Sequence, residues 1–431
     1  MQPFRLPESF LFGTATAGLQ VEGGSVPSNW LRWCDEDRIR DGSHCRRADD
    51  HWNRVGADTE LLRSLGVQTI RLGVEWSRIE PEEGRFDESA LAHYRAEIEG
   101  LLKAGIRTLV TLHHFSHPLW FEDSGGWEDS RAPDRFVRYV RKVVESLGEL
   151  VNDWITINEP NVYAYNGYIT GEWPPGKKNI RAMFRCIRGM SLAHIDAYRT
   201  IREIRSAKGF PGDTKVGVAN HVRVFDPADS AIGSRIAAAL LDRLFHGIFM
   251  EAMGRGIFRL PLGVGRPRGK GRFYDFIGIN YYSRYMVSLH LLPFRFSLGF
   301  REGAEKNDLG WEIYPEGLYR EGVKLYRKYG APVWITENGT ADAKDAFRSR
   351  YLADHLAQVR RLLDDGVPVE RYYHWTFIDN FEWTEGESAH FGLVENDFPS
   401  QKRKIRESGK LYSRICREKG LTADAIRESG I

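Results

Sequence analysis

The feature that most constrains the fold of this chain is a series of short apolar segments, rich in β-branched and aromatic residues, spread over its whole length. Such segments are typical of strands buried on both faces of a parallel sheet. The stretches between them are long enough for helices and carry apolar residues at helical spacing. The predicted strands are Phe10–Thr14, Thr69–Val74, Thr108–Leu112, Trp154–Ile157, Lys215–Ala219, Phe276–Ile279, Val333–Thr336 and Arg371–Thr376.

Eight strands alternating with helices favour a single (β/α)8 TIM barrel, with the active site at the C-terminal ends of the strands. One predicted helix covers residues 88–104, with a buried stripe formed by Leu91, Tyr94, Ile98, Leu101 and Leu102. The alternative topology is a doubly wound sheet, which usually carries a glycine-rich phosphate turn after its first strand. Residues 12–18 lack that glycine spacing, and no Pro/Ser/Gly linker divides the chain, so residues 1–431 are interpreted as one domain.

Charge and hydropathy exclude several classes of partner. The 61 basic and 59 acidic residues nearly cancel, so no net field favours nucleic acid or an anionic membrane. No apolar run approaches the roughly 20 residues of a membrane helix, and residues 1–8 lack the pattern of a signal peptide. The four cysteines have no motif spacing, which favours free thiols. We therefore expect a cytoplasmic protein without a membrane or nucleic-acid partner.

Two glutamates follow predicted strands in the same way. The apolar run 154–157 ends at Asn158 and Glu159, and Pro160 then stops the strand. The run 333–336 ends at Glu337, followed by Asn338 and a glycine. Because a barrel gathers the C-terminal ends of its strands on one face, the two carboxyl groups should lie near each other. Cleavage of a glycosidic bond requires such a pair.

A cation and three histidines accompany these carboxylates. Arg71 stands inside a predicted buried strand, where a guanidinium needs a partner. A carboxylate of the site is the natural partner and would be held ionised; a structural salt bridge to a helix is the alternative. His113 and His114 point to opposite faces of a strand and cannot easily share a metal. No zinc pattern is present, so no metal is predicted. We expect one of the three histidines (the third is His117) to face the cavity and the others to pack in the core.

Two further segments have competing interpretations. Trp375, at the end of the eighth predicted strand, is followed by Glu382 and Trp383, a mixture of aromatic faces and planar acceptors that suits sugars. Aromatic residues at such positions are more often part of a core. The loop 262–272 alternates glycine with arginine and lysine, which indicates either a solvated loop or a site for an anionic ligand.

Taken together, these motifs identify a resemblance to glycoside hydrolase family 1, the β-glucosidase family, over nearly the whole chain. Each motif is modest alone, but their shared order is specific. The matching segments are Phe10–Ala17 with Gln20–Gly23, Glu75–Arg78, Asn158–Pro160, Asn280–Tyr282, Gly310–Glu312, Thr336–Gly339 and Asp379–Trp383.

The resemblance implies a retaining double displacement with Glu159 as acid/base and Glu337 as nucleophile, and no cofactor. Arg71, Tyr282 and Asn280 would support the nucleophile. The implied substrate-binding residues are Gln20, His114, Asn158, Trp311, Trp375, Glu382, Trp383 and Phe391. The chain departs from the family pattern at Leu19, Phe115 and His390, which leaves the leaving-group preference open.

The expected function is hydrolysis of terminal non-reducing β-D-glucosyl residues, with β-D-galactosyl or β-D-fucosyl residues also possible substrates. The partner would be a small β-glycoside or a short oligosaccharide. Two alternatives stay open at this point. A transglycosylase would share the covalent intermediate, and a non-catalytic sugar-binding barrel would normally lack one of the two glutamates.

Overall fold

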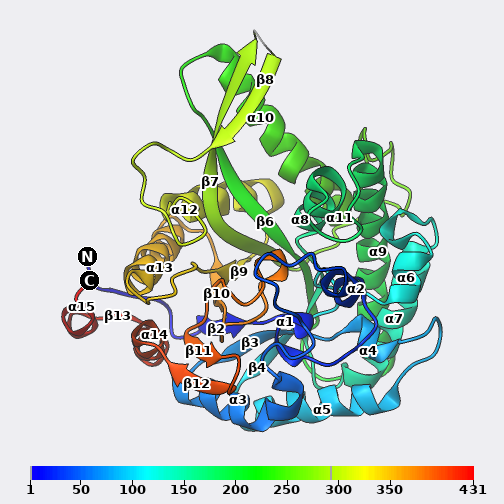
Figure 1. Ribbon diagram of the computed structural model, residues 1–431, viewed down its shortest axis with the longest axis horizontal. Helices are drawn as coiled ribbons and strands as arrows, with labels where there is room; N and C mark the ends of the chain where they lie inside the picture. Colours follow the sequence, from blue (N-terminus) through cyan, green and yellow to red (C-terminus); the bar gives the residue numbers. More distant parts are fainter. Residues whose placement is uncertain (1, 292–293) are drawn as a thin grey trace.

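A computed structural model describes residues 2–291 and 294–431, with side chains described outside 290–296. Its centre is a ring of parallel strands in the order β6-β5-β4-β3-β2-β10-β9-β7, closed by pairing of β7 with β6 (Figure 1). The ring consists of β2 (Leu11–Ala15), β3 (Thr69–Gly73), β4 (Arg107–Thr111), β5 (Asp153–Asn158), β6 (Lys215–Pro227), β7 (Ile277–Leu291), β9 (Val333–Asn338) and β10 (Val369–Trp375). This closure confirms the predicted (β/α)8 barrel and excludes the open doubly wound sheet.

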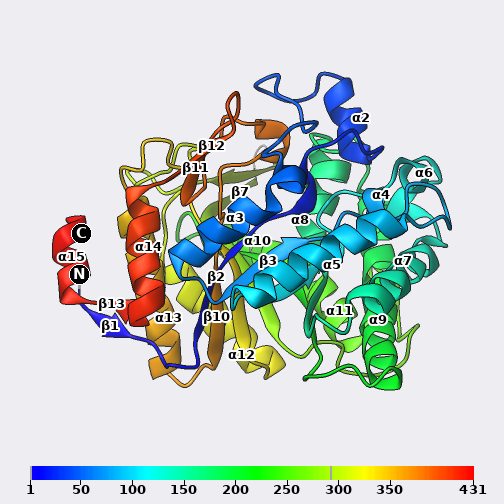
Figure 2. The same ribbon diagram turned by 90° about the horizontal axis from the view of Figure 1, so that it is seen from below.

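Helices cover the outside of the ring, as Figure 2 shows from below. The main helices are α3 (His51–Leu65), α5 (Glu88–Lys103), α7 (Ala132–Leu147), α9 (Ile180–Ala207), α11 (Ile248–Arg255), α12 (Glu316–Tyr329), α13 (Arg348–Asp364) and α14 (Glu407–Glu418). The stripe predicted for α5 is buried except at Leu102, which is 37% exposed. Leu101 already occupies the buried face, and its neighbour is turned about 100° away.

Shorter elements build the rim and the ends of the chain. The short helices are α1 (Gly18–Glu22), α2 (Asn29–Asp35), α4 (Trp76–Ile79), α6 (Leu119–Asp123), α8 (Pro160–Tyr165), α10 (Ile232–Asp242) and α15 (Ala423–Ser429). Single turns are η1 (Gly126–Glu128), η2 (Asn166–Thr170), η3 (Arg243–Gly247) and η4 (Trp383–Glu385). The outlying strands are β1 (Phe4–Arg5), β8 (Phe294–Gly299), β11 (Val394–Asp397), β12 (Lys402–Ile405) and β13 (Gly420–Leu421).

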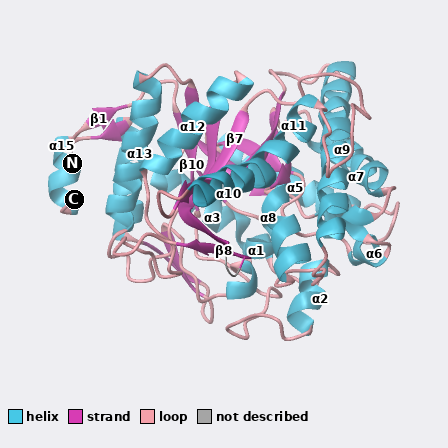
Figure 3. Cartoon of the chain, turned by 90° about the horizontal axis from the view of Figure 1, so that it is seen from above, coloured by secondary structure: helices cyan, strands magenta, loops and turns pink. Residues whose placement is uncertain are grey.

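Strands β6 and β7 run well beyond the predicted strands and leave the barrel together. Beyond the ring, β7 pairs antiparallel with β8, and these two strands project from the molecule (Figure 1). Helix α10 packs against the outer halves of β6 and β7, as the view from above also shows (Figure 3). This extension lies on the side of the barrel where β6 and β7 end, next to the predicted position of Glu159.

The N-terminal end of the barrel is closed by packing and by an ion pair. Arg371 donates to Asp153 at 2.7 Å across the barrel, and its guanidinium lies 3.7 Å from the centre of the Trp334 ring. The Trp334 ring stacks on Phe276 with centroids 3.8 Å apart. Stabilising contacts thus occupy this end, as is usual in such barrels.

The two ends of the chain meet at the side of the barrel. Strand β1 pairs antiparallel with β13, so Phe4 lies opposite Leu421, and the termini are adjacent in Figures 1 and 2. Within the described part of the chain, no helix combines the length and apolarity needed to cross a membrane.

The close approach of β9 to β10 requires a glycine. A Cβ on Gly339 would lie 1.7 Å from the carbonyl oxygen of Trp375, a contact that only backbone movement can relieve. We expect Gly339→Ala to lower the free energy of unfolding by about 1–3 kcal/mol or more, because overpacking usually costs that much. Gly100→Ala is a matched control, because its Cβ meets nothing within 4 Å and α5 should gain about 0.5–1 kcal/mol. Thermal unfolding of both variants checks this, and equal midpoints would contradict it.

Candidate active site

The two glutamates lie at the C-terminal end of the barrel and are almost completely buried. Glu337 belongs to β9 and Glu159 directly follows β5, with 3% and 6% of their surfaces exposed. The backbone of Glu159 has φ of 41°, a left-handed conformation that is unfavourable for a non-glycine residue. Its N–H donates to the carbonyl of Ala219 on β6 at 2.8 Å, and Pro160 begins α8. This sharp turn holds Glu159 at the end of its strand.

Glu337 is surrounded by donors. The Arg71 guanidinium donates to its Oε1, and the Tyr282 hydroxyl donates to its Oε2 at 2.5 Å. Arg71 is completely buried and also donates to Thr111 Oγ1 at 3.0 Å and Asn158 Oδ1 at 2.7 Å. The carboxylate partner of Arg71 is therefore Glu337 itself, and no helix residue takes that place.

Glu159 has a different environment. The Asn280 amide donates to its Oε1 at 2.9 Å, and His221 Nδ1 lies 3.0 Å from the same oxygen. Among the described residues, no lysine or arginine nitrogen lies within 4.0 Å of the Glu159 carboxyl group. One glutamate is thus paired with a cation and the other is not.

The position of Asn280 corrects its predicted role as a support of Glu337. Its Oδ1 accepts from the Thr336 hydroxyl at 2.6 Å, which turns the amide N–H groups toward β5. These donate to Glu159 and, at 3.0 Å, to Asn158 Oδ1. Asn280 is aligned with Glu337 in the strand pairing, but its side chain connects β7 to β5.

A compact group of polar and aromatic side chains lies beside the glutamates. Trp375 Nε1 donates to Glu382 Oε1 at 2.9 Å, and Gln20 Nε2 lies 3.3 Å from Glu382 Oε2. Gln20 Oε1 is buried and accepts no hydrogen bond from any described residue. The ring of Trp383 lies 5.7 Å from that of His114 at an angle of 27°. The group offers aromatic faces, a carboxyl group and a free amide oxygen.

His114 joins this group to the glutamates. Its ring nitrogens lie 2.9 Å from Asn158 Nδ2 and 3.3 Å from Arg71 Nη2. Burial and the nearby guanidinium hold the pKa of His114 well below its usual value, so the ring is neutral. By contrast, His113 and His117 are buried in the core, with His113 Nε2 lying 3.4 Å from His117 Nδ1.

Trp311 and Phe391 lie on the Tyr282 side of the site. Their rings are 6.1 Å apart, and each packs against Tyr282, with centroids at 5.9 and 6.4 Å. Trp311 is partly exposed and Phe391 is buried. The structure thus places every predicted site residue at one end of the barrel.

Burial dominates the protonation of two carboxyl groups. It raises the pKa of Glu337 to about 7, with Glu159 adding to the shift and Arg71 and Tyr282 opposing it. Burial also raises the pKa of Glu382 to about 8, partly opposed by the hydrogen bond from Trp375. The sequence predicted that Arg71 would keep its partner ionised. The guanidinium acts in that direction, but desolvation of Glu337 outweighs it.

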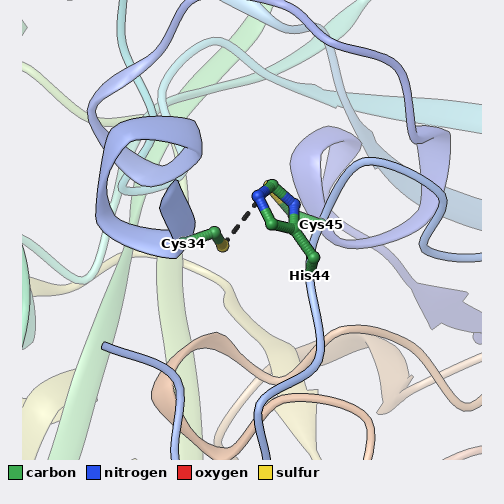
Figure 4. A group of neighbouring side chains, drawn as sticks. All are labelled: Cys34, His44 and Cys45. Carbon is green, nitrogen blue, oxygen red and sulfur yellow. Dashed lines mark hydrogen bonds between the residues drawn. The ribbon is translucent and has the colours of Figure 1, made fainter. Parts of the chain in front are cut away.

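Groups of side chains that could hold a metal ion lie elsewhere. Ligand atoms come within 4.8 Å of one another in two groups of described residues, Cys34–His44–Cys45 and Asp242–His246–Glu321. In the first, the thiol sulfurs are 3.6 Å apart, and all four cysteines of the chain are free (Figure 4). In the second, the Lys324 ammonium already donates to Asp242 and Glu321. Neither group includes Glu159 or Glu337.

Strand β6 adds residues to the site that were not predicted from the sequence. His221 contacts Glu159, and the ring of Phe245 from η3 packs edge-on against His221 at 6.0 Å. Arg223 follows two positions later on the same strand. A polar His221 shortly after an apolar strand is the same signal that identified Glu159, but the predicted strand ended at Ala219 and was not followed further.

The fold and the site together define a class of protein. It is a (β/α)8 barrel with two buried glutamates at its C-terminal end and a group of polar and aromatic side chains beside them. Comparison with known sequences agrees with this class. The family described as "Glycosyl hydrolase family 1" matches residues 2–261 and 270–421, leaving out most of the basic loop. The chain is 34% identical to "Beta-glucosidase A" of Thermotoga maritima, over 97% of this chain and 99% of that protein. It is 31% identical to a "Beta-galactosidase" of Pyrococcus woesei, over 96% and 98%.

Solved structures give the same result. A β-glycosidase from Pyrococcus horikoshii superimposes with a TM-score of 0.91 at 36% identity, covering 100% of this chain and 99% of that one. A β-glucosidase from Thermotoga maritima in complex with glucoimidazole gives 0.89 at 32% identity, covering 97% and 100%. The chain therefore belongs to glycosyl hydrolase family 1 and is a β-glucosidase-type hydrolase.

The raised pKa of Glu337 generates a pH prediction. If Glu337 must be ionised, kcat/KM should fall as pH drops through about 7. Tyr282→Phe removes a donor that lowers this pKa, so the acid limb should move up by roughly 1–2 pH units, since a hydrogen bond to a charged group contributes about 1.5–3 kcal/mol. The measurement is kcat/KM of an aryl β-glucoside against pH.

Tyr281→Phe is the matched control, because the Tyr281 hydroxyl donates to the Tyr314 carbonyl and not to a glutamate. Its acid limb should stay in place. If the acid limbs of the two variants lie at the same pH, the Tyr282 hydroxyl does not set the ionisation of Glu337.

Proposed function

We propose that residues 1–431 form one catalytic domain that hydrolyses terminal β-D-glucosyl residues of small glycosides or short oligosaccharides with retention of configuration. β-D-Galactosyl and β-D-fucosyl residues are further candidate substrates. The observation that carries the proposal is the unequal pairing of the two glutamates. Glu337 accepts from a guanidinium and a phenol, whereas Glu159 has no described cation beside it. An ionised nucleophile and a protonated acid require this asymmetry.

The first step of the proposed reaction forms a glycosyl-enzyme. A carboxylate oxygen of Glu337 bonds to the anomeric carbon while the bond from that carbon to the leaving oxygen breaks. Glu159 gives its proton to the leaving oxygen, and the alcohol departs. Charge that leaves Glu337 during the attack weakens its pairing with Arg71, so the buried guanidinium is free to strengthen its bonds to Asn158.

The second step reverses the roles. Glu159, now a carboxylate, takes a proton from water, and the water oxygen bonds to the anomeric carbon as the ester to Glu337 breaks. His221 and Asn280 hold the Glu159 carboxyl group through both steps. A sugar alcohol in place of water would give transglycosylation by the same route, and product analysis distinguishes the two.

The polar and aromatic group beside the glutamates supports binding of the non-reducing sugar. A sugar hydroxyl can donate to Gln20 Oε1, which has no partner among the described residues. Glu382 accepts from Trp375 and can accept from further hydroxyls. The rings of Trp375 and Trp383 supply apolar faces for the C–H groups of the sugar. Relatives in this family bind sugar-like inhibitors, glucoimidazole among them.

The roles of the glutamates can be separated by substitution. Glu337→Ala should abolish hydrolysis of every glycoside, because no group remains to form the glycosyl-enzyme. Glu159→Ala should spare the first step for very acidic leaving groups, while alkyl glucosides lose roughly 10²–10⁴-fold, the usual contribution of a general acid. Azide should restore turnover of this variant and yield the β-glycosyl azide, identified by NMR. An α-azide, or equal losses for all leaving groups, would refute the assignment.

The surroundings of Glu382 predict discrimination against 6-phosphorylated sugars. No cation is among the main influences on this carboxyl group, so a phosphate placed there would lack a partner. We expect an aryl β-glucoside to be cleaved at least about 100-fold more efficiently than its 6-phosphate, which corresponds to about 2.8 kcal/mol. Because Glu382 ionises as pH rises through about 8, the ratio should increase with pH. Comparable kcat/KM values for the two substrates would show that Glu382 does not contact the sugar's 6-position.

A further inference from the structure

Arg223 is a buried arginine at the rim of the site, close to Glu159. It lies on β6 two residues after His221, and 9% of its surface is exposed. The pairing of β6 with β7 shifts between Val222 and Val224, so Arg223 occupies an irregular position in the ladder. Such irregularities often redirect side chains next to active sites.

The guanidinium of Arg223 has no anionic partner. Among the described residues, no carboxylate oxygen lies within 4.0 Å of it, and its side chain donates no hydrogen bond. Its Nε is buried and unpaired. Two other buried arginines do have carboxylate partners: Arg71 pairs with Glu337, and Arg284 pairs with Asp226 and Glu312.

Among the described residues, the guanidinium contacts an aromatic ring. Its central carbon lies 4.0 Å from the centre of the Tyr285 ring on β7. Stacking on a ring is favourable for a cation but leaves its N–H groups without acceptors. A buried guanidinium with unpaired donors is unfavourable for the free protein and favours binding of an anion.

The surroundings place this cation on the leaving-group side. His221 contacts the proton-donating Glu159, and Phe245 packs against His221. Tyr165, at the end of the helix that follows Glu159, is 41% exposed. Burial lowers the pKa of His221, and the charge of Arg223 adds to that shift; the same charge opposes the rise that burial gives the pKa of Tyr165. The aromatic neighbours of Arg223 are Tyr285, under its guanidinium, and Phe245, which packs on Phe225 and on His221.

We propose that Arg223 binds a carboxylate on the leaving group, so that the preferred substrates are β-glycosides of aromatic carboxylic acids linked through a phenolic oxygen. The inference deepens the proposed function and rests on Glu159 being the proton donor. A single unpaired cation matches the single charge of a carboxylate better than the double charge of a phosphate monoester. The rings of Tyr165, Tyr285 and Phe245 match an aromatic leaving group.

The test compares two substrates that differ in this charge, 4-carboxyphenyl β-D-glucoside and its methyl ester. Selectivity is kcat/KM for the carboxylate substrate divided by kcat/KM for the ester. The intrinsic difference between the two phenols cancels when this ratio is compared between the parent protein and a variant. Arg223→Gln should lower selectivity roughly 10–100-fold, the equivalent of a charge-assisted hydrogen bond of about 1.5–3 kcal/mol. Arg223→Lys, which keeps the charge but loses the planar fork, should retain part of the selectivity.

Arg243→Gln is the matched control. Arg243 is an exposed arginine of η3, two residues before Phe245, and its removal changes the net charge equally. The selectivity of the Arg243→Gln variant should equal that of the parent protein. Thermal unfolding should show Arg223→Gln to be at least as stable as the parent, because the substitution removes an unpaired buried charge. Unchanged selectivity in Arg223→Gln would overturn the proposal and leave Arg223 a stacking partner of Tyr285.

A binding measurement separates this proposal from the proposed function. Calorimetric titration with 4-hydroxybenzoate and 4-hydroxybenzamide requires no hydrolysis. The parent protein should bind the acid more tightly than the amide, and Arg223→Gln should lose that preference. If the parent protein binds the acid more tightly than the amide but hydrolyses no glycoside, the result would count against the proposed hydrolytic function and not against the role of Arg223. Equal binding of acid and amide by the parent would refute the role of Arg223.

Discussion

The contact between Arg71 and Glu337 is the interaction on which the rest of the site depends. The completely buried guanidinium on β3 donates to groups on β4, β5 and β9. It thereby fixes the distance between strands whose ends carry the chemistry. Breaking a buried pair by removing one partner typically costs about 3–5 kcal/mol, because the remaining charge is left uncompensated. The position of Glu337 is therefore coupled to the stability of the barrel.

The same burial that makes this pair strong works against its charge. Glu337 and Glu382 are nearly removed from water, and the charge of a neighbouring glutamate adds to the rise that burial gives the pKa of each. These two carboxyl groups therefore tend to hold protons near neutral pH. A bound sugar would replace water with hydroxyl donors aimed at Glu382, and such donors favour the ionised form. Substrate binding and the charge state of the site are linked through this balance, at some expense of stability in the free protein.

Most of the barrel could be predicted because its strands are buried on both faces and therefore read as apolar runs. Each run from Phe10 to Thr376 corresponds to a strand of the ring, and the glutamates stand where two of those strands end. The predicted strands ended where the apolar runs end, but β6 and β7 continue beyond the barrel with polar residues among the apolar ones and pair with each other. His221 and Arg223 lie in that continuation. The partner of Asn280 could not be predicted for another reason. The register of a strand ladder decides which residues are neighbours, but the hydrogen bonds of an amide decide which way it points. Here the amide of Asn280 is oriented by the Thr336 hydroxyl.

The two sides of the site differ in how completely their polar groups are satisfied. On the sugar side, Glu382, Trp375 and Asn158 contact one another or their neighbours through several hydrogen bonds, which fixes their geometry before a sugar arrives. A satisfied and buried network tolerates few substitutions, because each change leaves a partner unpaired. On the side of β6, the guanidinium of Arg223 stacks on the Tyr285 ring and has no carboxylate partner among the described residues. A barrel of this kind can therefore keep its reaction while the leaving group it prefers changes with single residues on β6 and the helices that follow it.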